Sequence, residues 1–320
     1  MPSNTLSSTE PMPPATEAGR PDGYAGGPKA PFRPAGLWVA LLTPFRDQQV
    51  DHAALARLVK RLDHDGVDGL VVCGSTGEAA SLGVHERHAA LRTVAQAAPD
   101  LPLIVGLSAE SLHEARHWAH AVRQEHPQVR ALLVPAPSYV RPSQAGLLAW
   151  FDAVATAAER PIVVYDIPYR TGTPIELETL LRLAQDPRFV GIKDCGGNAN
   201  KTQQLIHDGH LAVMAGEDLQ AFASLALGAA GAILACAHVA TPHWVRLVQH
   251  LRRGELAAAR VLWPRLRPLA EALMAEPNPA VIKAVLAAHE GFLLPDTRLP
   301  LTISSQTARE RASDLFKMLC

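Results

Sequence analysis

The sequence predicts a (β/α)8 barrel, of the TIM-barrel type, followed by a C-terminal helical extension. Short apolar runs of strand character alternate with segments of helical periodicity along most of the 320-residue chain. Eight such units follow one another, and short apolar strands separated by helices are typical of a parallel sheet covered by helices. After the eighth run the pattern becomes entirely helical. Polar residues stand where the apolar runs end, which is where barrel enzymes place their chemistry.

The composition divides the chain into three parts. From Met1 to about residue 33 the chain is rich in Pro, Gly, Ser and Thr and almost free of aliphatic residues. Such a segment buries too little apolar surface to offset its ordering entropy, so we expect a disordered tail over residues 1–33. The barrel is expected over residues 34–253 and a bundle of C-terminal helices over residues 254–320.

The individual elements follow from the apolar pattern. The expected strands are Leu37–Thr43, Gly69–Cys73, Leu103–Gly106, Ala131–Val134, Ile162–Asp166, Val190–Lys193, Ala212–Ala215 and Ala232–Ala235. The expected helices are His52–Asp65, His85–Ala98, Ser111–Glu125, Gln144–Glu159, Glu176–Gln185, Ala199–Asp208, Pro242–Arg253, Glu255–Leu273, Pro279–His289 and Ser304–Lys317. An open doubly wound sheet would more often carry a glycine-rich loop after its first strand, and Thr43-Pro44-Phe45-Arg46 is not one.

Charge and cysteine content exclude several classes of protein. The net charge is −1 and charged residues make up 19% of the chain, so nucleic acid and charged membrane surfaces are not expected partners. No apolar run reaches the length of a membrane span, and the N-terminus lacks the features of a secretion signal. The four cysteines are widely spaced without a metal-binding pattern, which suits a reducing compartment. We therefore expect a cytoplasmic protein without a bound metal.

The strand Phe189–Asp194 ends in a lysine, Lys193. Burial disfavours an ammonium group and lowers its pKa, and a neutral amine is a nucleophile for carbonyl carbon. This is the usual starting point of Schiff-base chemistry. The alternative is a lysine that extends from the strand end to water.

The ends of the other strands favour the chemical interpretation. Hydroxyls, two tyrosines and an arginine are expected on the same face as the lysine: Thr43, Ser75, Thr76, Tyr139, Tyr165 and Arg170. Together these groups are suited to bind a carboxylate, form an imine and move protons.

Four segments carry a family resemblance. Gly74–Glu78, Tyr165–Gly172, Gly191–Asp194 and Glu276–Pro279 resemble the dihydrodipicolinate synthase / N-acetylneuraminate lyase family of pyruvate-dependent class I aldolases. The resemblance extends from about Leu37 to Leu301. It implies an enzyme that uses no cofactor, because the substrate pyruvate itself forms the covalent Schiff base.

The resemblance also implies residue roles. Lys193 would form the imine with pyruvate, and Tyr165 would be the general acid and base over it. Ser75 and Thr76 would hold the pyruvate carboxylate and relay protons, and Tyr139 would cross a dimer interface into the neighbouring site. Further substrate contacts are implied for Thr43, Gly77, Gly216 and Ile233.

Arg170 indicates the second substrate. The synthase branch of the family uses an arginine there to bind the carboxylate of aspartate semialdehyde, and a guanidinium suits a carboxylate because it binds bidentately. The implied reaction condenses pyruvate with L-aspartate 4-semialdehyde in lysine and diaminopimelate biosynthesis, within a homodimer or a dimer of dimers (a homotetramer). Asp166 and the stretch Asp194–Gly197 depart from the family pattern. They leave open a paralogous aldolase or dehydratase that acts on a 2-keto-3-deoxy sugar acid or another aldehyde.

Two rival interpretations remain. His113-Glu114-Ala115-Arg116-His117 matches H-E-x-x-H, a zinc metallopeptidase pattern, but in a barrel this helix packs on the outside, away from the strand ends. A family member that has lost turnover and serves as a binding or regulatory protein is the second rival. The filled catalytic positions argue against it.

The resemblance finally bears on regulation. Free lysine inhibits many synthases of this family at a dimer-interface site. In this chain Val84, Arg87, Glu110 and Ser138 replace that site's polar residues, and only its acidic residue is kept, as Glu114. We therefore expect weak or absent inhibition by lysine.

Overall fold

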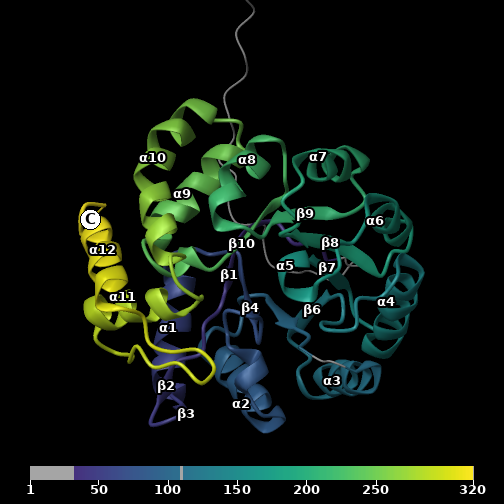
Figure 1. Cartoon of the computed structure of the whole chain (residues 1–320), viewed down its shortest axis with the longest axis horizontal. Helices are drawn as coiled ribbons and strands as arrows, with labels where there is room; N and C mark the ends of the chain where they lie inside the picture. The colour runs from purple at the N-terminus through teal and green to yellow at the C-terminus, as the bar shows by residue number, and fades with distance from the viewer. Residues whose placement is uncertain (1–31, 109–110, 320) are drawn as a thin grey trace, which may run out of the picture. The chain divides into compact units, whose positions relative to one another are not determined.

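The computed structural model describes residues 32–108 and 111–319. Eight parallel strands close into a barrel in the order β1-β10-β9-β8-β7-β6-β5-β4, which confirms the predicted fold class (Figure 1). The barrel strands are β1 Gly36–Ala40, β4 Gly69–Val72, β5 Leu103–Gly106, β6 Val129–Pro135, β7 Ile162–Asp166, β8 Phe189–Asp194, β9 Ala212–Ala215 and β10 Gly231–Leu234. Most of the expected disordered tail, residues 1–31, lies outside the described residues.

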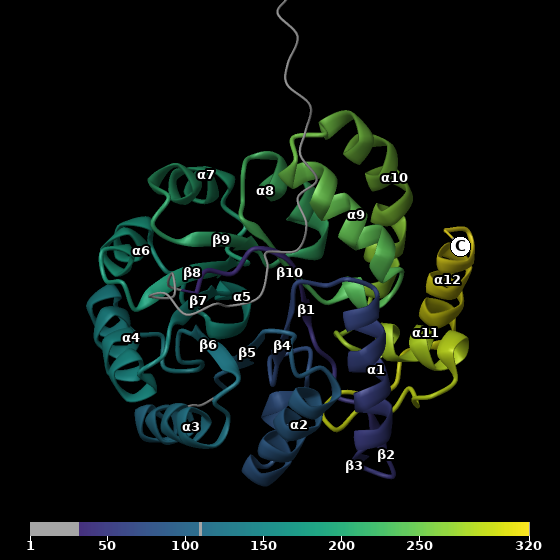
Figure 2. The same ribbon diagram turned by 180° about the vertical axis from the view of Figure 1, so that it is seen from behind.

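Helices surround the barrel (Figure 2). The outer helices are α1 His52–His64, α2 Val84–Ala97, α3 Leu112–Glu125, α4 Gln144–Ala158, α6 Leu177–Ala184, α7 Ala199–Asp208, α8 Ala221–Ala226 and α9 Thr241–Arg252. Several begin at a residue whose side chain accepts a hydrogen bond from a backbone N–H of the first turn, as Asp51 does from Ala54 and Asn198 from Lys201. No helix among the described residues is both long and apolar enough to cross a membrane.

Short elements escape the sequence pattern. The strands β2 Phe45–Arg46 and β3 Gln49–Val50 form a hairpin, and a four-residue helix, α5 Pro168–Thr171, follows β7. The first barrel strand ends at Ala40 rather than at Thr43. The two-residue strands and the single helical turn α5 are too short for an apolar run or a helical period to form, which is why the pattern missed them.

The apolar residues form two separate layers. The inner layer fills the lumen of the barrel and includes Trp38, Ile104 and Val163, whereas the outer layer lies between the strands and the helices. The Trp38 ring crosses the lumen against Gly69, where an added Cβ would lie 2.4 Å from the ring. Glycine at that position therefore makes room for the ring that closes the N-terminal part of the lumen.

Three C-terminal helices lie outside the barrel on the side of α9 and α1 (Figures 1 and 2). They are α10 Leu256–Leu273, α11 Ala280–Glu290 and α12 Gln306–Lys317. Leu266 of α10 and Ile282 of α11 belong to the same outer apolar layer as the barrel helices. On α11, Lys283 reaches Glu78 in the loop after β4, with 2.5 Å between nitrogen and oxygen and both side chains fully buried. The C-terminal helices thereby hold the loop Gly74–Glu78, whose hydroxyl residues Ser75 and Thr76 lie between two glycines and are called the hydroxyl motif below.

Candidate active site

The candidate site is built around Lys193 and Tyr165, which are neighbours because β8 pairs with β7. The register makes the two residues cross-strand partners. The Lys193 amine donates a hydrogen bond to the Tyr165 phenol oxygen at 3.4 Å, and its nitrogen lies 4.6 Å from the centre of the tyrosine ring. Both residues are buried. The structure therefore brings the predicted nucleophile and the predicted proton carrier together.

The ionisation of the pair differs from the sequence expectation. Burial disfavours the ammonium form, but the interactions with Tyr165 and Cys195 outweigh burial and raise the pKa of Lys193 above its ordinary value. The expectation of a lowered pKa is thus wrong, because it considered desolvation without the neighbouring groups. Burial also raises the pKa of the Tyr165 phenol, so tyrosine is protonated and lysine is an ammonium at neutral pH.

The hydroxyl motif lies against this pair. The Ser75 hydroxyl is close enough to the Tyr165 phenol to lower its pKa, against the larger effect of burial. The Thr76 hydroxyl is buried and accepts a hydrogen bond from the Asn278 amide nitrogen at 2.9 Å. Asn278 lies in the segment Glu276–Pro279, which carries the family resemblance, but no role was predicted for it.

The other predicted contacts line the lumen or position the motif. The Thr43 hydroxyl donates a hydrogen bond to the carbonyl oxygen of Gly77 at 2.8 Å, so Thr43 stabilises the loop that contains the hydroxyl motif. Ile233 belongs to the inner apolar layer. At Gly216 an added Cβ would lie 2.9 Å from Cγ of Lys193, so glycine leaves room for the lysine stem. The substrate contacts of these residues stay predictions.

Arg170 is exposed on α5, at the mouth of the barrel. Its guanidinium carbon lies 5.9 Å from the centre of the Tyr169 ring. The Tyr169 hydroxyl in turn donates to a Glu217 carboxylate oxygen at 2.9 Å, which joins the loops that follow β7 and β9. Sequence reasoning missed this link, because two single polar residues 48 positions apart carry no local signal.

Both departures from the family pattern have structural partners. Asp166 is fully buried and forms an ion pair with Lys201 of α7. Its other oxygen accepts from the backbone N–H of Ile175 at 3.1 Å. Asp194 accepts from the Thr202 hydroxyl at 2.5 Å. Since the residues alternate along a strand, Asp166 points toward α7 while Tyr165 points into the lumen.

Tyr139 does not join the other residues within the single chain. It lies in the loop after β6 with a positive φ of 73° and a side chain that is 97% exposed. A role in catalysis for this residue therefore depends on a second copy of the chain.

The H-E-x-x-H segment lies on α3, on the outside of the barrel. His113, Glu114 and His117 are all exposed there. In the described part of the chain, the three metal-binding side chains that come within 4.8 Å of one another are instead His88, Glu125 and His126. This group also lies on the outer helices and not beside Lys193.

Comparison with known proteins agrees with this architecture. Residues 33–319 match the model of the dihydrodipicolinate synthetase family. The 4-hydroxy-tetrahydrodipicolinate synthase of Syntrophus aciditrophicus is 36% identical over 281 residues, which cover 86% of this chain and 95% of that protein. That of Mycolicibacterium gilvum is 38% identical over 273 residues, covering 85% of this chain and 89% of that protein.

Solved structures lead to the same family. The dihydrodipicolinate synthase of Acinetobacter baumannii, solved in complex with pyruvate, superimposes with a TM-score of 0.84 at 32% identity, covering 88% of this chain and 98% of that one. The enzyme of Thermotoga maritima gives a TM-score of 0.85 at 29% identity, covering 89% and 98%. The chain therefore belongs to the dihydrodipicolinate synthetase family.

Proposed function

We propose that this chain catalyses the 4-hydroxy-tetrahydrodipicolinate synthase reaction, the condensation of pyruvate with L-aspartate 4-semialdehyde through a Schiff base on Lys193. The observation that carries the proposal is a buried lysine amine 3.4 Å from the phenol of Tyr165, at the ends of adjacent barrel strands. The names of the relatives support it, and the pyruvate complex of the Acinetobacter baumannii enzyme supports pyruvate as the first substrate.

The chemistry needs only groups of the chain and the substrates. The Lys193 ammonium first loses a proton, and the neutral amine then attacks the carbonyl carbon of pyruvate. The resulting carbinolamine loses water when a proton is delivered to its hydroxyl, which leaves the imine. Loss of a methyl proton gives the enamine, whose carbon attacks the aldehyde. Tyr165, hydrogen-bonded to Lys193 and close to Ser75, is the group that we assign to these proton transfers.

Arg170 supports an aldehyde that bears a carboxylate. Asp166 departs from the family pattern, but its ion pair with Lys201 gives it a structural role. A different substrate is therefore not needed to explain this aspartate, which favours the synthase reaction over the paralogous one. A panel of aldehydes assayed with pyruvate separates the two reactions. It contains aspartate semialdehyde, N-acetylmannosamine and the aldehyde products of 2-keto-3-deoxy sugar acid cleavage, and the proposal requires the first to be preferred.

The matching variant is Arg170→Ala. Loss of a charge-assisted hydrogen bond of about 2–3 kcal/mol lowers kcat/KM for aspartate semialdehyde about 30- to 200-fold. Imine formation with pyruvate, measured by borohydride trapping, is the internal control and is expected to survive. Equal damage to both steps would make Arg170 a structural residue and remove its support for the substrate.

A homodimer or a dimer of dimers is part of this proposal. The almost fully exposed side chain of Tyr139 and the exposed Val140 next to it supply an apolar surface on the loop after β6. In such an assembly Tyr139 would extend into the partner's site. We also propose a cytoplasmic location, where thiols such as Cys73 stay reduced.

We further propose that the enzyme is insensitive, or only weakly sensitive, to lysine. Val84 is half exposed and offers no hydrogen bond. The Arg87 guanidinium already donates to the carbonyl oxygens of Leu82 and Ser108 at 3.1 and 3.2 Å and lies over the Trp118 ring. It is therefore engaged and poorly placed to bind a carboxylate.

An initial-rate titration with millimolar lysine checks this, with unchanged or only slightly lowered rates as the expected result. Saturating inhibition would contradict it. Glu110, which belongs to the same comparison, lies outside the described residues.

A further inference from the structure

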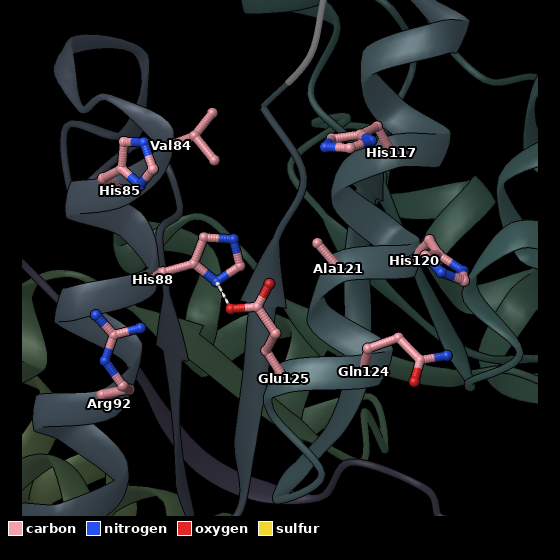
Figure 3. A pocket seen from close by; sticks show the side chains of 9 residues that line it. All are labelled: Val84, His85, His88, Arg92, His117, His120, Ala121, Gln124 and Glu125. Carbon is pink, nitrogen blue, oxygen red and sulfur yellow. Dashed lines mark ion pairs between the residues drawn. The ribbon is translucent and has the colours of Figure 1, made fainter.

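A histidine-rich groove lies on the outside of the barrel between α2 and α3. Its volume is about 540 Å³, and it is lined by Val84, His85, His88, Arg92, His117, His120, Ala121, Gln124 and Glu125. Figure 3 shows His88 extending from α2 and Glu125 extending from α3 toward each other across its floor. None of these residues has a part in the Schiff-base chemistry.

Three side chains converge at the floor of the groove. Nδ1 of His88 lies 2.9 Å from Nε2 of His126 and 3.2 Å from Oε2 of Glu125. His126 is only 1% exposed and His88 is 7% exposed, whereas the Glu125 side chain is about half exposed. The cluster is thus built from two buried imidazoles and closed toward the groove by a carboxylate.

These contacts leave more lone pairs than protons. If Nδ1 of His88 carries a proton, that one proton faces both the His126 nitrogen and the Glu125 oxygen. His126 must then carry its own proton on Nδ1, which is buried and has no hydrogen-bond partner. In the opposite arrangement Nε2 of His126 carries the proton and donates it to Nδ1 of His88. The unprotonated Nδ1 of His88 then faces the Glu125 carboxylate without a proton between them. In either case three potential ligand atoms share a single proton.

The charges around the cluster have opposing effects on a cation. Glu125 is the last residue of α3, where the helix dipole favours positive charge. Arg92, on the groove wall, opposes it.

We propose that His88, Glu125 and His126 form a binding site for a divalent transition metal ion such as Zn²⁺. Bonds of about 2.0–2.1 Å in a tetrahedral zinc site put the ligand atoms about 3.3 Å apart, close to the 2.9 and 3.2 Å that separate Nδ1 of His88 from the other two ligand atoms. When the metal binds, the proton of His88 moves from Nδ1 to Nε2. The fourth position faces the groove and takes water. This site is independent of the proposed aldolase reaction.

Zinc titration of the untagged, chelator-treated full chain by calorimetry tests the proposal. One Zn²⁺ per chain with micromolar or tighter affinity is expected. Loss of an outer-sphere partner alone weakens metal sites 10- to 100-fold, so His88→Gln is expected to weaken binding at least about 100-fold. Glu125→Gln is expected to weaken it at least about tenfold, and because this side chain is half exposed the variant decides the matter even if His88→Gln fails to fold.

His113→Gln is the matched control, because His113 lies on the same helix in the H-E-x-x-H segment but does not line the groove. Its zinc affinity is expected to equal that of the parent, and turnover with pyruvate is expected to be normal in all three variants. Absence of stoichiometric binding, full affinity in Glu125→Gln, or loss of binding in His113→Gln would each overturn the proposal.

Discussion

The described residues include two kinds of buried lysine, and the contrast between them bears on the proposal that only Lys193 forms an imine. Lys283 is 0% exposed and Lys201 is 8% exposed, and each is paired with a buried carboxylate, Glu78 and Asp166 respectively. Lys193 is 5% exposed and has a tyrosine phenol as its hydrogen-bond partner instead. A carboxylate partner stabilises the charged ammonium form of a lysine. A phenol partner can instead donate and accept protons.

The pKa by itself would select the wrong lysine. Burial outweighs Glu78 and lowers the pKa of Lys283 to about 8, closer to neutrality than an ordinary lysine. Its nitrogen, however, also donates to the carbonyl oxygen of Asp296 at 2.8 Å and lies 4.2 Å from the centre of the Phe45 ring. No face of this amine is open to a carbonyl substrate. Lys193 has the higher pKa but lies beside the Tyr165 phenol, so the proposed reactivity rests on geometry and not on the pKa.

The largest expected effect tests whether Lys193 is the reactive member. Lys193→Ala is expected to lower turnover at least about 10⁴-fold, because the covalent nucleophile is lost. Borohydride reduction with pyruvate followed by peptide mass spectrometry is expected to modify Lys193 in the parent. Modification of Lys283 or Lys201 instead would contradict the proposal that a phenol partner, and not a carboxylate partner, marks the reactive lysine.

A second experiment tests whether Lys283 is structural. Glu78→Gln leaves a fully buried ammonium without its countercharge, so the free energy of unfolding is expected to fall by about 3–5 kcal/mol in urea denaturation. Asp314→Asn, which breaks the exposed pair with Lys317, is the control and is expected to change it by less than about 1 kcal/mol. If both variants unfold alike, the buried pair does not hold the C-terminal helices to the hydroxyl motif.

The smallest effect concerns pH. Because the pKa of Lys193 is raised, the neutral amine is a minor form at pH 7, and its fraction rises about tenfold for each pH unit below the pKa. The rate constant of imine formation with pyruvate can be followed by rapid-quench borohydride trapping. It is therefore expected to rise as the pH is raised from about 6.5 to about 8.5. A plateau across this range would indicate a lowered pKa.

Tyr165→Phe sharpens the same measurement. It removes the neighbour that contributes most to raising the pKa of Lys193 and leaves desolvation, which lowers it. The pH profile of the slower variant is therefore expected to shift toward lower pH. An unshifted profile would mean that another group sets the ionisation of Lys193.

Local pattern was sufficient for most of the fold. The eight barrel strands and the long helices were predicted because each buries an apolar run or stripe of several residues. The hairpin β2–β3 and the helix α5 were missed because elements this short show no hydrophobic periodicity. Near the site, Lys193, Tyr165 and Ser75 were predicted from their positions at strand ends, and the structure brings these three together.

The partners of the site residues were beyond local pattern. Lys283 and Glu78 are 205 residues apart, and Asn278 and Thr76 are 202 apart. The ion pair between Asp166 and Lys201 joins a strand to the helix beyond the next strand. The members of such pairs are brought together by the closed barrel or by the packing of the C-terminal helices, so no short window of sequence contains both.

The sequence by itself determined the barrel, the residues at its strand ends and the family resemblance, because apolar periodicity and strand-end residues are local properties of the chain. Only the tertiary structure decided which buried lysine has a phenol and which have carboxylates, and whether the pKa of Lys193 rises or falls. The physical reason is that desolvation and charge act through space. The same burial lowers the pKa of Lys283 and is outweighed at Lys193, according to neighbours brought in by cross-strand register and by long-range packing.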